Sequence, residues 1–100
     1  MSSSPKIERK LAAIMFTDIV GFTETISGDE EYAYRLIDKK RKLLFPLITQ
    51  KDGKLIKEIG DGTLSKYSSS TNAIHCAKEF LEKLKDIDDL EVRAGIHYGE

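Results

Sequence analysis

Hydrophobic and polar positions alternate along the chain in two patterns, one typical of strands and the other of helices. A continuous apolar run at residues 11–17 predicts a strand that is buried on both faces. Residues 54–59 and 63–67 have the composition of two further strands, joined by a hairpin turn at Gly60-Asp61-Gly62. Residues 92–98 alternate apolar and polar side chains, which predicts a fourth strand.

Two other segments repeat their apolar residues at the three- and four-residue spacing of an amphipathic helix. Asp29 is an N-cap candidate for a long first helix, and residues 68–71 supply N-cap candidates for a second. Pro46 lies inside the first pattern, where it should kink the helix or end its regular part. The expected buried positions are Ala33, Leu36, Ile37, Leu44, Leu47 and Ile48 in the first helix, and Ala73, Ala77, Phe80, Leu81 and Leu84 in the second.

The order of the elements is strand-helix-strand-strand-helix-strand, which is that of an α+β fold with a ferredoxin-like, palm-like βαββαβ core. It predicts a four-stranded antiparallel sheet with two helices, in which the first and third strands are neighbours at the centre. Asp18 follows the first strand, and Asp61 precedes the third. The topology therefore predicts that these two carboxylates meet, although they are far apart in the sequence.

Composition and charge narrow the classes of protein to consider. The 100 residues are enough for one small domain, which we expect at residues 10–100 behind a flexible lead at residues 1–9. A net charge of −1 excludes the basic footprint of a nucleic-acid-binding protein, and the basic run at residues 39–42 is expected to be a solvated helix face. Cys76 is the only cysteine, which excludes a disulfide framework and a zinc cluster. The sequence has no membrane-spanning run and no signal peptide, so we expect a cytoplasmic segment without direct membrane contact.

Two carboxylates at one end of a sheet suit a hard divalent cation. Without a cation they would repel each other, and one of them would take up a proton. Magnesium takes oxygen ligands, and it often uses only one or two carboxylates together with water and substrate phosphates. Residues 19–23 add backbone amides near a helix start, and such amides form a concave site for anions. This combination suggests a nucleoside triphosphate held by two metal ions.

Three motifs resemble the class III adenylate/guanylate cyclase catalytic domain, in the order and at the spacing of that family. Each motif alone is weak, whereas the ordered set is highly specific because it fixes residues at three places that the fold brings together. The resemblance extends over residues 10–100 and covers about the first, N-terminal half of the family's domain. The motifs are Phe16-Thr17-Asp18-Ile19-Val20-Gly21-Phe22-Thr23, Lys57-Glu58-Ile59-Gly60-Asp61-Gly62 and Arg93-Ala94-Gly95-Ile96-His97-Tyr98-Gly99.

The resemblance implies a role for each matching residue. Asp18 and Asp61 match the catalytic aspartates that bind two Mg²⁺ or Mn²⁺ ions, and the carbonyl of Ile19 matches a further metal ligand. Arg93 matches a basic residue that contacts phosphate in some members. Lys57 matches the purine-selecting position, which is Lys in adenylate cyclases and Glu in guanylate cyclases. The amides that match the triphosphate-binding loop belong to Ile19, Val20, Gly21, Phe22 and Thr23.

The implied activity is that of an adenylate cyclase, which converts ATP to cyclic AMP and pyrophosphate by two-metal-ion catalysis at a homodimer interface. ATP and a second copy of the domain are therefore the expected partners. Lys57 favours ATP because lysine only donates hydrogen bonds and adenine N1 accepts one, but donation to guanine O6 does not exclude GTP. The family's second purine contact and its transition-state Asn and Arg have no counterpart in these 100 residues, so the chain alone is expected to be inactive or nearly so. Membrane attachment through other domains of a parent protein stays open.

Several alternatives remain open at this point. The main one is a non-catalytic, cyclase-like nucleotide-binding or regulatory module, although such a module need not retain both Asp18 and Asp61. A diguanylate cyclase is a second, but the Gly-Gly-Asp/Glu-Glu-Phe turn of that family is absent. An unrelated ferredoxin-like binding module is a third. Taken singly, the two aspartates are consistent with turn residues, and Lys57 and Arg93 with solvated strand residues.

Overall fold

The computed structural model describes residues 11–99, and within them the predicted order of strands and long helices is confirmed. The predicted flexible lead at residues 1–9 lies outside the described residues. One short helix, α1, interrupts the predicted order directly after the first strand. The elements are β1 (Ala12–Ile19), α1 (Phe22–Gly28), α2 (Glu30–Gln50), β2 (Lys54–Ile59), β3 (Gly62–Tyr67), α3 (Ser70–Leu84) and β4 (Val92–Gly99).

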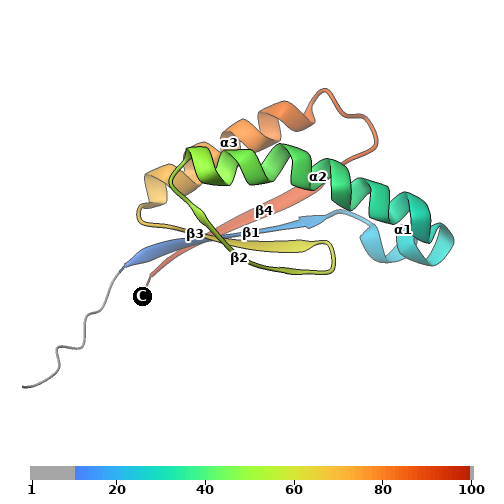
Figure 1. The fold of residues 1–100 in the computed structure, drawn as a ribbon, viewed down its shortest axis with the longest axis horizontal. Coiled ribbons are helices and arrows are strands. Elements are labelled where there is room, and N and C mark those ends of the chain that lie inside the picture. The colour runs from blue at the N-terminus through green and yellow to red at the C-terminus, as the bar shows by residue number, and fades with distance from the viewer. Residues whose placement is uncertain (1–10, 100) are drawn as a thin grey trace, which may run out of the picture.

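The strands form an antiparallel sheet in the order β2-β3-β1-β4, so β1 and β3 are central neighbours as predicted. Helices α2 and α3 lie side by side over one face of this sheet (Figure 1). No element within residues 11–99 covers the opposite face, which we call the outer face. The chain therefore has the two-layer α+β architecture of a ferredoxin-like, palm-like fold. Within residues 11–99, no helix combines the length and the apolar character needed to span a membrane.

The core lies between the sheet and the two long helices, and it takes only one face of β1. Ala13 and Met15 point toward the helices and are at most 1% exposed, whereas Phe16 lies on the outer face and is 43% exposed. The prediction that this strand is buried on both faces is therefore wrong. Both covering helices lie on the same side, so the apolar residues of the outer face keep their contact with solvent.

Helix α2 continues through Pro46 to Gln50, so the proline does not end the helix, which was one of its two expected effects. Proline removes one backbone donor from the helix. Leu44, Leu47 and Ile48, on either side of Pro46, are at most 2% exposed. This burial holds both halves of the helix against the same core and outweighs the lost hydrogen bond.

One further boundary and one buried position differ from the prediction. β1 extends to Ile19, so Asp18 lies inside the strand and not in a turn, because both residues pair with β4. Leu81 is 41% exposed although it was predicted to be buried. The stripe of α3 that packs on the sheet runs through Phe80 and Leu84, and Leu81 points away from it.

Candidate active site

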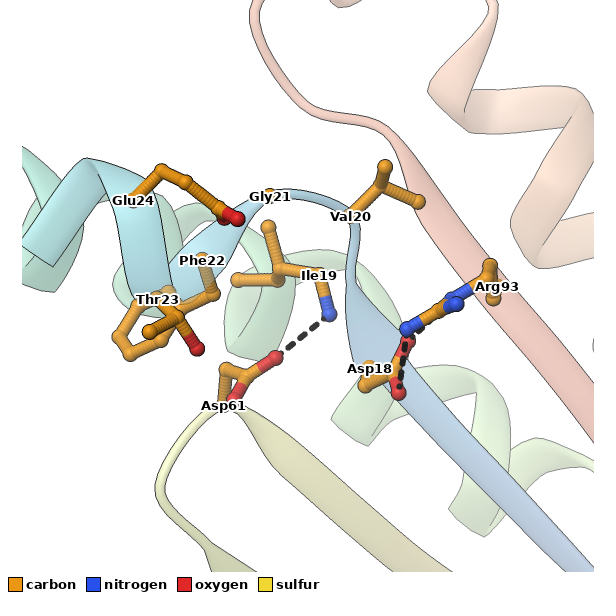
Figure 2. A pocket seen from close by; sticks show the side chains of 9 residues that line it. All are labelled: Asp18, Ile19, Val20, Gly21, Phe22, Thr23, Glu24, Asp61 and Arg93. Atoms are coloured by element: carbon orange, nitrogen blue, oxygen red, sulfur yellow. Dashed lines mark hydrogen bonds and ion pairs between the residues drawn. The ribbon is translucent and has the colours of Figure 1, made fainter.

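The two predicted aspartates lie at one end of the sheet, around a hollow of about 540 Å³ (Figure 2). β1 supplies Asp18, and the turn between β2 and β3 supplies Asp61, as the topology predicts. Glu24, from the unpredicted helix α1, adds a third carboxylate to the wall of the hollow. The hollow is lined by Asp18, Ile19, Val20, Gly21, Phe22, Thr23, Glu24, Asp61 and Arg93.

Asp18 is held by Arg93, its partner across the β1–β4 ladder. The Arg93 guanidinium donates from Nε to Asp18 Oδ1 at 3.0 Å and from Nη2 to Oδ2 at 3.2 Å. These hydrogen bonds raise the pKa of Arg93. The Asp18 side chain is 21% exposed and that of Arg93 is 72% exposed, so the pair lies at the mouth of the hollow. In the absence of other ligands, Arg93 thus provides the positive charge beside Asp18.

Asp61 is placed by a tight two-residue turn between the paired residues Ile59 and Gly62. Gly60 has φ +58°, whereas Asp61 keeps a negative φ, which is the pattern of a type II′ turn. This turn directs the Asp61 carboxylate toward the end of β1, where Oδ2 accepts a hydrogen bond from the Ile19 amide at 2.8 Å (Figure 2). The bond joins the two strand ends that carry the carboxylates.

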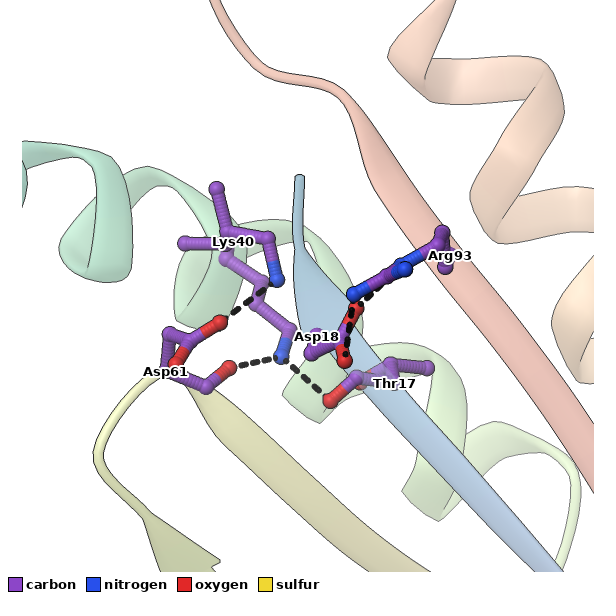
Figure 3. A network of polar contacts seen from close by, with 6 residues as sticks. Thr17, Asp18, Lys40, Asp61 and Arg93 are labelled. Atoms are coloured by element: carbon purple, nitrogen blue, oxygen red, sulfur yellow. Dashed lines mark hydrogen bonds and ion pairs between the residues drawn. The ribbon is translucent and has the colours of Figure 1, made fainter. Parts of the chain in front are cut away.

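Lys40 also belongs to this region, and the sequence interpretation missed it. The basic run at residues 39–42 was expected to be solvated, but Lys40 is only 2% exposed. Its Nζ donates to the carbonyl of Thr17 at 3.1 Å and to the carbonyl of Asp61 at 2.6 Å (Figure 3). Burial lowers the pKa of Lys40 to about 8, against the opposing attraction of Asp61, Asp18 and Glu58.

A signal for this burial was present in the sequence. Position 40 falls three or four residues from Leu36, Ile37 and Leu44, so it lies on the apolar stripe of α2. A lysine on the buried stripe of a helix needs acceptors inside the protein, because an unpaired buried charge is costly. Because Lys39, Arg41 and Lys42 beside it are also charged, the whole run was expected to face solvent.

The amides of residues 19–23 are only partly free to bind an anion. Ile19 donates to Asp61, and the Val20 amide donates to the carbonyl of Glu91 at 2.9 Å. The amides of Gly21, Phe22 and Thr23 have no acceptor among residues 11–99. The part of the predicted phosphate loop that remains available is therefore the turn into α1. Gly21 makes this turn with φ +72°, a conformation that favours glycine.

Lys57 is outside the hollow, on the edge strand β2. Its pairing with Leu64, and the pairing of Leu64 with Phe16, place all three side chains on the outer face in one row across the sheet. Asp18 lies on the same face, because it is two residues beyond Phe16 on β1. Lys57 thus shares a surface with Asp18 but is separated from it by the strand β3.

The donor set of the hollow fits a hard divalent cation. Within residues 11–99 there is no cluster of three or more His, Cys, Asp and Glu side chains suited to holding a metal ion. The two carboxylates of Asp18 and Asp61 must therefore be completed by water, a carbonyl or substrate oxygens, as is common for Mg²⁺. Both retain acceptor capacity, since an ionised carboxylate has about four lone-pair sites and these two accept two bonds and one bond.

Comparison with known proteins assigns the family. Residues 6–100 match the family described as "Adenylate and Guanylate cyclase catalytic domain". The chain belongs to this family. The matched residues include all three motifs that resemble this family.

One relative and one solved structure that are similar to this chain are named as cyclases, and a second relative is named as a protein kinase. Putative adenylate cyclase 3 of Rhizobium meliloti (strain 1021) is 29% identical over 102 residues, covering 94% of this chain and 17% of the relative. Serine/threonine-protein kinase pkn2 of Myxococcus xanthus is 36% identical over 96 residues, covering 87% of this chain and 11% of the relative. The adenylate/guanylate cyclase/hydrolase structure from Silicibacter pomeroyi is 28% identical with a TM-score of 0.80, covering 92% of this chain and 58% of that chain. The chain thus spans 58% of this solved cyclase and less than a fifth of either curated relative.

Proposed function

We propose that this cyclase domain converts ATP to cyclic AMP and pyrophosphate, with Asp18 and Asp61 as its metal-binding residues. The observation that supports the proposal is that both carboxylates line one hollow, where the Asp61 carboxylate accepts a hydrogen bond from the backbone amide directly after Asp18. In the reaction, the ribose 3′-oxygen bonds to the α-phosphorus while the bond from that phosphorus to pyrophosphate breaks. The family assignment supports a cyclase of either nucleotide type.

The residues around the hollow divide the work of binding. Asp18 and Asp61 would hold two Mg²⁺ or Mn²⁺ ions, with the Ile19 carbonyl as a further ligand. When bound, the metal ions would lower the pKa of the attacking hydroxyl and balance the negative charge of the triphosphate. The free amides of Gly21, Phe22 and Thr23 would bind phosphate oxygens, and Arg93 would do so from the mouth of the hollow. Positioning and charge stabilisation of this kind account for most of catalysis in phosphoryl transfer.

Lys57 is the residue that supports the choice of ATP over GTP. Lysine donates hydrogen bonds and accepts none, so it pairs with adenine N1 but not with the protonated N1 of guanine. The Lys57 side chain is exposed on the edge strand β2, where it is free to reach a base. The exchange Lys57→Glu is expected to weaken ATP use and favour GTP.

We further propose that a second copy of the domain completes the site. Lys57 lies outside the hollow, with β3 between it and the Asp18 strand, so one copy does not enclose a nucleotide between them. The outer face also exposes large apolar side chains, among them Phe16 at 43% and Ile59 at 60%. Exposed apolar surface of this kind marks an interaction site. A homodimer would place Lys57 of one copy near Asp18 of the other.

The experiment that tests the proposal uses the protein at its full natural length. ATP and GTP are supplied with Mg²⁺ or Mn²⁺, and cyclic nucleotide and pyrophosphate are measured. We expect cyclic AMP, and we expect Asp61→Asn to lower its rate by about 100-fold or more, because a charge-stabilising group is removed. Asp52→Asn is the matched control, since Asp52 also lies in a turn, at φ +56°, and asparagine tolerates that conformation.

One observation favours a second candidate function, the non-catalytic nucleotide-binding module. Both carboxylate oxygens of Asp18 are hydrogen-bonded to Arg93, so the site balances part of its own charge without a metal ion. A folded protein that binds nucleotide but yields no cyclic product from ATP or GTP would favour this module over the cyclase.

A further inference from the structure

Lys40 joins the two chain segments that carry the site carboxylates. One of its acceptors is the carbonyl of Thr17, the residue before Asp18, at 3.1 Å. The other is the carbonyl of Asp61 itself, at 2.6 Å. The lysine reaches both from α2, on the helix side of the sheet, while the carboxylates line the hollow (Figure 3). A single ammonium group on α2 thus connects β1 with the β2–β3 turn, on the helix side of the sheet.

The position is an unusual one for a lysine. Its neighbours on the same stripe of α2, Leu36, Ile37 and Leu44, are at most 7% exposed, so an apolar residue would pack there without a charge to compensate. A charged side chain at a buried position carries a desolvation cost that an apolar side chain in the same place would not have. Folding alone therefore gives little reason for a cation here, whereas two carbonyl acceptors at the site give a specific one.

Asp61 has little else to hold it. It occupies the two-residue turn of the β2–β3 hairpin, and the edge strand β2 is mostly exposed. Its fixed contacts are the Lys40 bond to its carbonyl and the Ile19 bond to its carboxylate. Loss of the first would free the turn to move, and the second bond would open with it.

We propose that Lys40 is a positioning residue that fixes the separation of Asp18 and Asp61. This inference rests on the proposed function, in which these carboxylates hold the metal ions. Lys40 touches no substrate in this role and acts through the backbone of Thr17 and Asp61. Catalytic groups held within about 0.5 Å of their productive geometry need such support, and misplacement by about 1 Å costs on the order of 100-fold in rate.

The test compares local and global opening of the chain. Amide hydrogen exchange is measured at Ile19, whose amide bonds to Asp61, and at Phe80, inside α3. Lys40→Met keeps an unbranched side chain, one atom shorter, and removes its donors. We expect the ratio of the Ile19 to the Phe80 exchange rate to rise about 10-fold or more. Lys40→Gln keeps an amide group that can donate hydrogen bonds and should raise the ratio less. This variant decides the question if the methionine variant does not fold.

The control is Leu44→Ala, one turn along the same stripe. Leu44 is fully buried, so its loss destabilises the whole domain and should speed Phe80 at least as much as Ile19, which means that the ratio should not rise. An unchanged ratio in Lys40→Met would overturn the proposal.

Activity provides the second readout. Where the wild type makes cyclic nucleotide, Lys40→Met should lower kcat by about 10-fold or more, and Leu44→Ala should not when assayed at a temperature at which it is folded. Full activity in the methionine variant would also overturn the proposal. A wild type without activity would contradict the proposed function alone, because the exchange ratio still decides the role of Lys40.

Discussion

At the level of single residues, two cations determine the electrostatics of this site, and they differ in burial. Lys40 lies below the sheet end at 2% exposure, whereas the Arg93 side chain lies at the mouth and is 72% exposed. Burial penalises the charged form of Lys40 and lowers its pKa to about 8, while Arg93 remains fully charged. The first therefore influences stability as the pH changes, and the second influences how the site receives an external cation.

The depressed pKa of Lys40 predicts a pH-dependent stability with a definite sign. Below about pH 8 the lysine is protonated in both states, and its burial disfavours the folded state. Between about pH 8 and the unfolded value of 10.5, the unfolded state binds more protons, so the free energy of unfolding should rise with pH. The rise amounts to at most about 3 kcal/mol.

This prediction is checked by denaturant unfolding across that pH window, for the wild type and for Lys40→Met. The wild type should gain stability relative to the variant as the pH rises. Burial raises the pKa of Tyr67, which opposes the trend at high pH, but both proteins share that group and its effect cancels in the difference. A difference that stays constant with pH would contradict the buried charge.

Arg93 predicts an effect on metal affinity. Its guanidinium occupies both oxygens of Asp18, so a divalent cation must share or displace it. Arg93→Ala should bind Mn²⁺ more tightly, by less than about fivefold because exposed ion pairs are weak. It should bind ATP less well at saturating metal, since the proposed phosphate contact of Arg93 would be lost. Titration calorimetry measures both affinities. Arg41→Ala removes a comparable ion pair, with Glu58 at 2.9 Å, outside the hollow and should change neither.

At the level of elements, the β2–β3 hairpin determines the position of the Asp61 carboxylate. Its short turn depends on one residue with a left-handed backbone, Gly60 at φ +58°. A Cβ at Gly60 would meet no atom within 4 Å, so any cost of a side chain there is conformational and not steric. The hairpin therefore allows a clean test of backbone geometry.

Gly60→Ala should destabilise the domain by about 1–2 kcal/mol, because an L-residue is strained in the left-handed region. Gly28→Ala is the matched control, since a Cβ at Gly28 also meets no atom within 4 Å and its φ is not positive. That change should be neutral or slightly stabilising. Equal effects of the two substitutions, measured by urea unfolding, would be inconsistent with a backbone requirement at the turn.

At the level of the whole molecule, the open outer face connects the fold to the proposed dimer. Asp61 and Lys57 lie only four positions apart in the sequence, yet the hollow includes the first and not the second. If each complete site takes its carboxylates from one copy and Lys57 from the other, the two residues can be separated genetically. The dimer proposal therefore predicts complementation.

An Asp61→Asn chain and a Lys57→Ala chain should each be nearly inactive alone. Mixed in equal amounts, half of the dimers contain one copy of each, and one of their two sites has both residues intact. The mixture should recover about a quarter of the wild-type rate, as isologous pairing predicts. Measured cyclic nucleotide formation that stays at the level of the single variants would contradict a shared site.

Much of this architecture was readable from local patterns. The periods of the apolar residues placed the four strands and both long helices, and the topology predicted that Asp18 and Asp61 meet. Helix α1 was missed because its segment has no buried residue, and therefore no apolar stripe to detect. The sequence left open whether α2 continues through Pro46, and the burial of residues on either side of the proline decided that it does.

The sequence by itself determined the order of elements and the two candidate carboxylates, because the periodicity that defines each element is set by residues close together in the chain. The tertiary structure alone decided which cationic side chains lie beside those carboxylates. Lys40 and its charged neighbours look alike in the sequence, and only the packing of α2 on the sheet removes one of them from water. The pairing of Arg93 with Asp18 likewise follows from the register of β1 with β4, which joins residues far apart in the chain.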